Sequence, residues 1–137
     1  MRELTIDAFF YGLFMDETVL IEANVVPREP RRAVISGYRL HLGERATMVP
    51  EFGSQVFGML FAITHAELHR LYSMPGLQAY RPQSVLAQLL DGSVCAASAY
   101  NLVTLPEQTQ PNPAYAEKLR AVLTRLGFPD SYVNSVV

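Results

Sequence analysis

Cysteine and charge are both scarce in this 137-residue chain, and each scarcity excludes a class of protein. Cys95 is the one cysteine, so neither an internal disulfide nor a cysteine zinc cluster is expected. Eleven basic residues against thirteen acidic ones give a net charge of −2, without the basic surplus typical of nucleic-acid binding. Apolar runs in the sequence are too short to span a membrane. We therefore expect neither a nucleic-acid nor a membrane partner.

Apolar residues, by contrast, are abundant. They make up 50% of the chain, and a chain of this length can bury a substantial core. We expect a single domain over residues 1–137. Acidic Glu3 and Asp7 stand where a secretion signal would need an apolar segment, which predicts a cytoplasmic protein.

Alternating and wholly apolar runs predict about six strands. The alternation changes phase at Gly37, which predicts a bent or bulged strand there, and the residues from Pro50 to Ser54 are typical of a loop. Asp91-Gly92 is a strong hairpin signal between the last two strands. The expected strands cover residues 4–10, 33–42, 46–49, 56–63, 80–90 and 93–102.

Capping signals mark the helices. Asp16 can cap a first helix, and a loop follows it at Pro27 and Pro30. Thr64 and Glu67 match the capping box of a second helix. The expected helices cover residues 16–22, 64–74 and 113–126, with a further short one at 130–134. Neighbouring strands with helices interspersed irregularly indicate the α+β class, as a small, mixed but mostly antiparallel β-barrel with two to three flanking helices.

Tyr11-Gly12 lies where the first strand gives way to a loop and a helix. A glycine there allows the backbone to approach a ligand closely, and the N–H groups of the loop and helix start are available to an anion. The segment therefore predicts a site for a carboxylate. The alternative interpretation is a plain connection in which Gly12 relieves backbone strain.

Several segments together resemble γ-glutamylcyclotransferase-like proteins, in the branch related to avirulence-induced proteins. The likeness runs from Phe9 to about Tyr100 and includes a similar C-terminal helix. The segments that carry it are Tyr11-Gly12-Leu13-Phe14-Met15-Asp16, Ser36-Gly37-Tyr38-Arg39-Leu40, Val56-Phe57-Gly58-Met59-Leu60-Phe61, Glu67-Leu68 and Tyr80-Arg81-Pro82.

The resemblance implies a cavity in which Tyr11, Gly12, Leu13, Phe14 and Tyr80 bind the amino-acid end of a small γ-glutamyl or amino-acid-like ligand. It implies no cofactor. Members of the family release 5-oxoproline when the α-amine attacks the γ-carbonyl, and a glutamate acts as the general base.

Ser73 stands where that glutamate is expected, seven residues before Tyr80, and the residues from Leu71 to Tyr80 include no carboxylate. A serine hydroxyl accepts a proton at neutral pH only when another base activates it. We therefore expect a binding protein with a degenerate active site. The alternative is an active cyclotransferase or amide-processing enzyme that uses a different base.

Two other residues are candidates for the general base. His69 precedes Ser73 by four positions and could form a Ser–His pair on one helix face, although a half-exposed histidine is the plainer interpretation. Glu51 could reach the cavity mouth from a loop, or simply be solvated. Cys95 is expected to be a buried structural thiol, and Tyr38 and Tyr72 are further candidates for the cavity wall. The three histidines lack metal-site spacing, so no metal is expected.

Overall fold

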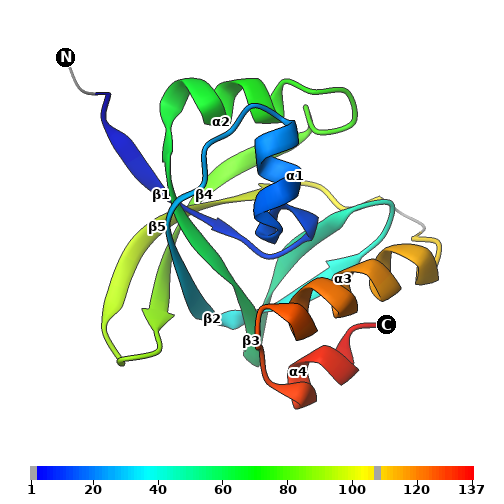
Figure 1. Ribbon diagram of the computed structural model, residues 1–137. Helices are drawn as coiled ribbons and strands as arrows, with labels where there is room; N and C mark the ends of the chain where they lie inside the picture. The colour runs from blue at the N-terminus through cyan, green and yellow to red at the C-terminus, as the bar shows by residue number, and fades with distance from the viewer. Residues whose placement is uncertain (1–2, 107–108) are drawn as a thin grey trace.

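A computed structural model describes residues 3–106 and 109–137 and contains a closed, mixed β-barrel with flanking helices (Figure 1). The strands follow the order β1-β3-β2-β4-β5, in which β1 and β5 close the barrel as a parallel pair and the other pairs are antiparallel. The strands are β1 (Thr5–Phe10), β2 (Arg28–Leu42), β3 (Ala46–Thr64), β4 (Tyr80–Leu89) and β5 (Val94–Leu102). The predicted α+β barrel is confirmed.

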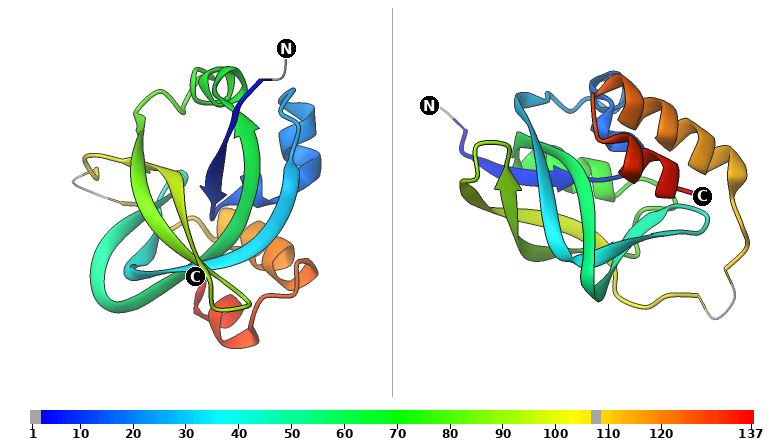
Figure 2. Two further views of the ribbon diagram at one scale, coloured as in Figure 1. Left: turned by 90° about the vertical axis from the view of Figure 1, so that its left-hand side faces the viewer. Right: turned by 90° about the horizontal axis from the view of Figure 1, so that it is seen from below.

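The helices lie outside the barrel. Figures 1 and 2 show α3 and α4 side by side against the barrel wall. The helical segments are the 3-10 turn η1 (Leu13–Met15), α1 (Glu17–Glu22), α2 (His65–Tyr72), α3 (Pro113–Arg125) and α4 (Asp130–Ser135).

The strand count differs from the prediction because β3 joins two predicted strands across the segment from Pro50 to Ser54. Opposite that segment, Gly37 has a φ of +86°, and the β2–β3 register shifts there. Ser36 pairs with Gln55, whereas Tyr38 pairs with Pro50, so the residues between Pro50 and Gln55 bulge outward without breaking the strand. The bend predicted at Gly37 is therefore confirmed, and the predicted loop is a bulge within β3.

The loop predicted around Pro27 and Pro30 is also partly wrong, because β2 already begins at Arg28. Glu29 has a φ of +52°, and the pairing with β3 is irregular between Arg28 and Arg31. Proline lacks the N–H that a strand ladder needs, and this irregularity is where a strand tolerates Pro30.

Two apolar cores share the wall of the barrel. Alternation along β1 places Phe9 in the barrel interior, with Val56 and Leu60, and places Phe10 in the outer core beneath the helices. Leu119 and Leu123 of α3 close the outer core and are fully buried. The loop after β1 therefore begins where the two cores meet.

The predicted capping box at the start of α2 is confirmed and extends beyond the helix. The Glu67 carboxylate accepts hydrogen bonds from the Thr64 amide at 2.9 Å and the Val26 amide at 2.8 Å, and it pairs with Arg28 at 2.8 Å. Burial opposes ionisation, but the bonds from Arg28 and the two amides outweigh it and lower the pKa of Glu67 to about 2. The carboxylate thus ties α2 to the start of β2.

Glu67→Gln should lower the free energy of unfolding by about 2–3 kcal/mol at pH 7, because the charge that binds Arg28 is lost. A depressed carboxyl pKa stabilises the fold above the unfolded-state value and ceases to do so as the pH falls toward the folded-state value. The difference between variant and wild type should therefore narrow from about pH 5 down to about pH 2.

Urea unfolding at several pH values measures this effect. Glu51→Gln is the matched control, because the half-exposed Glu51–Arg39 pair should contribute less than about 1 kcal/mol. A Glu67 effect that does not change with pH, or that merely equals that of Glu51→Gln, would contradict the assignment.

Candidate functional site

The loop after β1 is shaped by a close contact with α3. Gly12 has a negative φ of −110°, so left-handed backbone is not the reason for a glycine here. A Cβ atom at Gly12 would stand 2.6 Å from the Tyr115 hydroxyl oxygen. The Leu13 amide donates to that same hydroxyl at 3.3 Å. Glycine at position 12 is therefore required by the approach of Tyr115.

A cavity of about 170 Å³ opens beside this loop. Its wall includes all five residues proposed from the resemblance as ligand-binding: Tyr11, Gly12, Leu13, Phe14 and Tyr80. It also includes residues from α2, the β2–β3 turn, β5 and α3, which the structure brings to the same place. The remaining wall residues are Phe9, Phe10, Val19, Arg45, Ala46, Tyr72, Leu77, Tyr100 and Tyr115.

Two of the cavity's five tyrosine hydroxyls are held by the protein. The Tyr11 hydroxyl lies 2.7 Å from two acceptors, the Tyr100 carbonyl oxygen and the Asn101 Oδ1 atom. The Tyr80 hydroxyl donates to the Ala46 carbonyl oxygen at 2.5 Å. These bonds link the end of β1 to the neighbouring β5, and the start of β4 to the start of β3.

The other three hydroxyls are available as donors. Within residues 3–106 and 109–137, the hydroxyls of Tyr72, Tyr100 and Tyr115 have no acceptor. The rings of Tyr72 and Tyr100 stack with centroids 3.8 Å apart and an interplanar angle of 8°. The cavity wall thus includes three tyrosines whose hydroxyls can still donate a hydrogen bond.

All five phenols are neutral at physiological pH. Burial raises the pKa of Tyr80 to about 12 and holds the pKa values of Tyr11, Tyr72, Tyr100 and Tyr115 above the usual value for tyrosine. A protonated phenol donates a hydrogen bond and does not accept a proton at pH 7. The tyrosines can therefore orient a ligand but cannot act as a general base.

Arg45 is the cationic group at the cavity. It is exposed and stands where the cavity meets a wider groove of about 490 Å³, which Arg45 and Tyr80 also line. Arg45 forms no ion pair with any carboxylate in the described part of the chain. A Cβ atom at Gly76 would come within 2.9 Å of its guanidinium, so the glycine leaves room for that group. Arg45 can therefore bind an anion at the cavity mouth.

Ser73 is exposed at the end of α2, and it is not among the described residues of the cavity wall. Its hydroxyl donates to the His69 carbonyl oxygen at 2.6 Å, which is a main-chain contact and does not involve the imidazole. The preceding residue, Tyr72, is the one that reaches the cavity.

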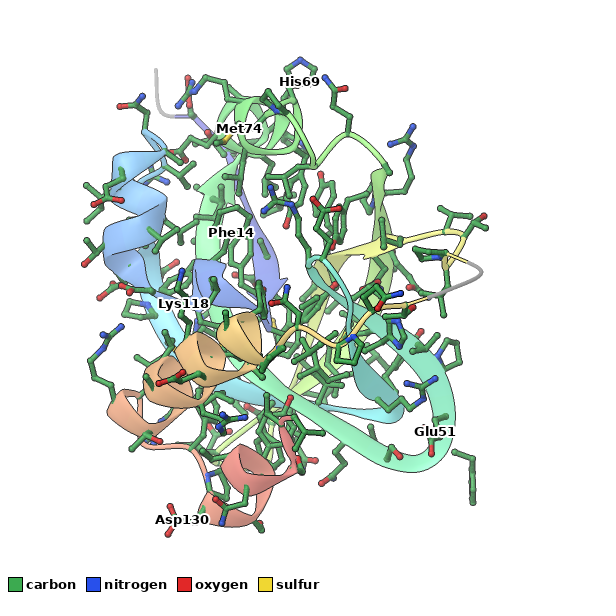
Figure 3. All side chains as sticks on the ribbon, turned by 90° about the vertical axis from the view of Figure 1, so that its right-hand side faces the viewer. Phe14, Glu51, His69, Met74, Lys118 and Asp130 are labelled. Atoms are coloured by element: carbon green, nitrogen blue, oxygen red, sulfur yellow. The ribbon has the colours of Figure 1, made fainter. Side chains whose placement is uncertain are left out.

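The other weighed residues lie elsewhere. Figure 3 shows His69 and Glu51 at the periphery, far from each other and from Phe14. Glu51 pairs with Arg39 at 2.8 Å, and the Tyr38 hydroxyl accepts a bond from Gln83. Cys95 is partly exposed, contrary to the expected buried thiol, and donates to Asp7 on the barrel wall.

Sequence reasoning missed Arg45, Tyr100 and Tyr115 as cavity residues. Arg45 follows a strand without belonging to a motif, and Tyr115 fits the apolar stripe of α3 equally well as a core residue. The sequence holds one local signal for Tyr115, which is Gly12. A glycine at that position indicates that a side chain from elsewhere in the fold approaches the backbone of the loop closely.

Residues 3–106 and 109–137 bring together no group of three or more His, Cys, Asp or Glu side chains suited to a metal ion. No helix in those ranges combines the length and apolar character of a membrane span.

Comparison with known proteins identifies similar folds. A crystal structure of the human uncharacterized protein loc79017 has a TM-score of 0.79 and 19% identity, with 98% of this chain and 87% of that chain covered. A structure named gamma-glutamyl cyclotransferase has a TM-score of 0.82 and 18% identity, with 96% of this chain and 86% of that chain covered. The crystal structure of YkqA from Bacillus subtilis has a TM-score of 0.76 and 23% identity, with 96% of this chain and 55% of that chain covered. None of the curated proteins compared matches this chain.

A match to a protein-family model shows the family to which the chain belongs. The model described as "Gamma-glutamyl cyclotransferase, AIG2-like" matches residues 8–118, which include the end of β1, the Tyr11-Gly12 loop, all the other strands and the start of α3. The chain therefore belongs to the AIG2-like gamma-glutamyl cyclotransferase family.

Proposed function

We propose that this protein binds a small γ-glutamyl or amino-acid-like carboxylate in the cavity beside the Tyr11–Phe14 loop, and that it does not catalyse cyclisation of that ligand. One observation carries the proposal. Among the described residues, the ionisable side chains of the cavity wall are Arg45 and five tyrosines with raised pKa values. This set of groups favours binding an anion over removing a proton.

The cavity wall includes groups that can hold a carboxylate. The guanidinium of Arg45 supplies the charge, and the Tyr72, Tyr100 and Tyr115 hydroxyls supply hydrogen bonds. In the described part of the chain the Gly12 and Phe14 amides also have no acceptor, whereas the Leu13 amide is taken by Tyr115. A carboxylate bound at the loop would satisfy these amides.

Cyclisation needs a further group. The α-amine of a γ-glutamyl compound is protonated at neutral pH and must lose a proton before it attacks the γ-carbonyl. Neutral phenols and a guanidinium cannot accept that proton, and the Ser73 hydroxyl is bonded to the His69 carbonyl oxygen. Loss of a general base lowers a rate by about 10²–10⁴-fold.

Wild-type protein should bind γ-glutamyl dipeptides or related carboxylates without releasing 5-oxoproline. Binding is measured by isothermal titration calorimetry and by the rise in melting temperature that a ligand of the folded state produces. Release of 5-oxoproline is measured by chromatography on the same samples. Turnover would overturn the proposed lack of catalysis, and failure of all the carboxylates to bind would overturn the proposed binding.

Arg45→Gln should weaken carboxylate binding by about tenfold, because the charge at the cavity mouth is lost. Arg70→Gln is the matched control: Arg70 is an exposed arginine of α2 that bonds to the Asn24 carbonyl oxygen and does not line the cavity. Titration of both variants with the best ligand of the wild type measures the effect. Equal affinity in the two variants would show that Arg45 does not contribute to carboxylate binding.

A further inference from the structure

We infer that two copies of this chain associate through a two-fold symmetric interface, in which Phe52 of each copy enters a surface pocket beside α4 of the other. Three observations support it: a fully exposed aromatic side chain, a pocket that begins next to it, and an ion pair that joins the two. The described residues of this pocket are separate from those of the cavity wall, so the inference does not rest on the proposed function.

Phe52 is the most exposed large apolar side chain among the described residues. Its relative exposure of 103% leaves the whole ring in water. It lies in the β3 bulge, and Figure 3 shows the preceding residue, Glu51, on the outer bend of that strand. Because pairing with β2 holds both ends of the bulge, the ring projects from an ordered strand. Aromatic side chains gain from burial and are enriched at protein interfaces, so Phe52 has the properties of an interface anchor.

A pocket of about 300 Å³, which we call the α4 pocket, begins beside the bulge. Ser54 and Gln55 line it, and they follow Phe52 by only two and three residues. A volume of about 150 Å³ is enough to hold a benzene ring, so the α4 pocket can accept a phenyl side chain. The apolar part of its wall comes from β2 and from the C-terminal end of the chain, and it includes Leu40, Leu42, Tyr132 and Val136.

The positions of the ring and the pocket favour a second copy of this chain as the partner. Phe52 does not line the α4 pocket of its own chain, although it stands next to it. A projecting side chain and a pocket that lie side by side on one face are complementary to the same face turned by 180°. Such a rotation places each ring over the pocket of the other copy and buries both rings. The contact closes after two copies.

The charges beside the ring and the pocket match in the same arrangement. Arg39 lines the α4 pocket and Glu51 precedes Phe52, and within one chain they pair at 2.8 Å with both side chains about half-exposed. When Phe52 of a second copy enters the pocket, the Glu51 of that copy comes to the side of Arg39. An exposed ion pair contributes little to the fold, so it can exchange partners at little cost. One rotation therefore satisfies the apolar contact and the ionic contact together.

Sedimentation velocity of the full chain, from about 1 μM to about 1 mM, tests the association over the range expected for a small interface. The mass should rise with concentration from one chain to two and should not rise further, because a two-fold contact is closed. A mass of one chain at every concentration would overturn the inference, and so would a mass that continues to rise beyond two chains.

Phe52→Ser tests the proposed anchor. It should weaken self-association by at least about a hundredfold, because the symmetric dimer loses two buried rings. Leu90→Ser is the matched control: Leu90 lies in the turn between β4 and β5, is 74% exposed and does not line the α4 pocket. Equal association of the two variants would overturn the inference.

A mixing experiment tests the two-fold arrangement. In a dimer of Arg39→Glu chains both interface charges are acidic, and in a dimer of Glu51→Arg chains both are basic, so each variant alone should associate at least about tenfold more weakly than the wild type. An equimolar mixture pairs opposite charges at both pockets and should recover the association. A mixture no tighter than its components would overturn the arrangement. If either variant does not fold, as judged by circular dichroism, the comparison of Phe52→Ser with Leu90→Ser still decides the inference.

Discussion

The approach of the Tyr115 hydroxyl to Gly12 is the contact on which the cavity depends. It joins the first loop of the chain to a helix about a hundred residues later, through the bond from the Leu13 amide to that hydroxyl. The buried residues Leu119 and Leu123 hold α3 in the outer core, and Tyr115 adds its ring to the cavity wall. Because the rest of the wall comes from the barrel, α2 and the β2–β3 turn, the cavity is a property of the assembled fold and not of any one motif.

The barrel fixes the shape of the cavity, while the few ionisable groups set its chemistry. Tyr11 and Tyr80 use their hydroxyls to bond backbone carbonyl oxygens of β5 and β3, and they contribute mainly geometry. Tyr72, Tyr100 and Tyr115 contribute donors, and Arg45 contributes charge. Family membership is consistent with this division, since a shared barrel can hold a different set of side chains. The proposed binding without catalysis follows from those side chains and not from the fold.

Local signals predicted much of the fold. Thr64 with Glu67, and Asp91 with Gly92, each determine a cap or a turn through bonds within a few residues, and both form as predicted. The continuity of β3 through Pro50 and the position of Arg45 depend on pairing and packing between distant segments. A single sequence carries little information on such contacts, so the charged residue of the cavity was the hardest to find.

The end of α2 shows why counting along a sequence locates a position but not a side chain. Successive residues of a helix differ in direction by about 100°, so a step of one residue moves a side chain from solvent to the interior. Counting seven residues back from Tyr80 leads to Ser73 as the expected position of the general base. Ser73 is exposed, however, and the residue before it, Tyr72, lines the cavity. A neutral ring stacked on Tyr100 is thus what the end of this helix presents to the cavity. The ionic character of the cavity wall is therefore set by the cationic Arg45, while Tyr72 adds a neutral ring.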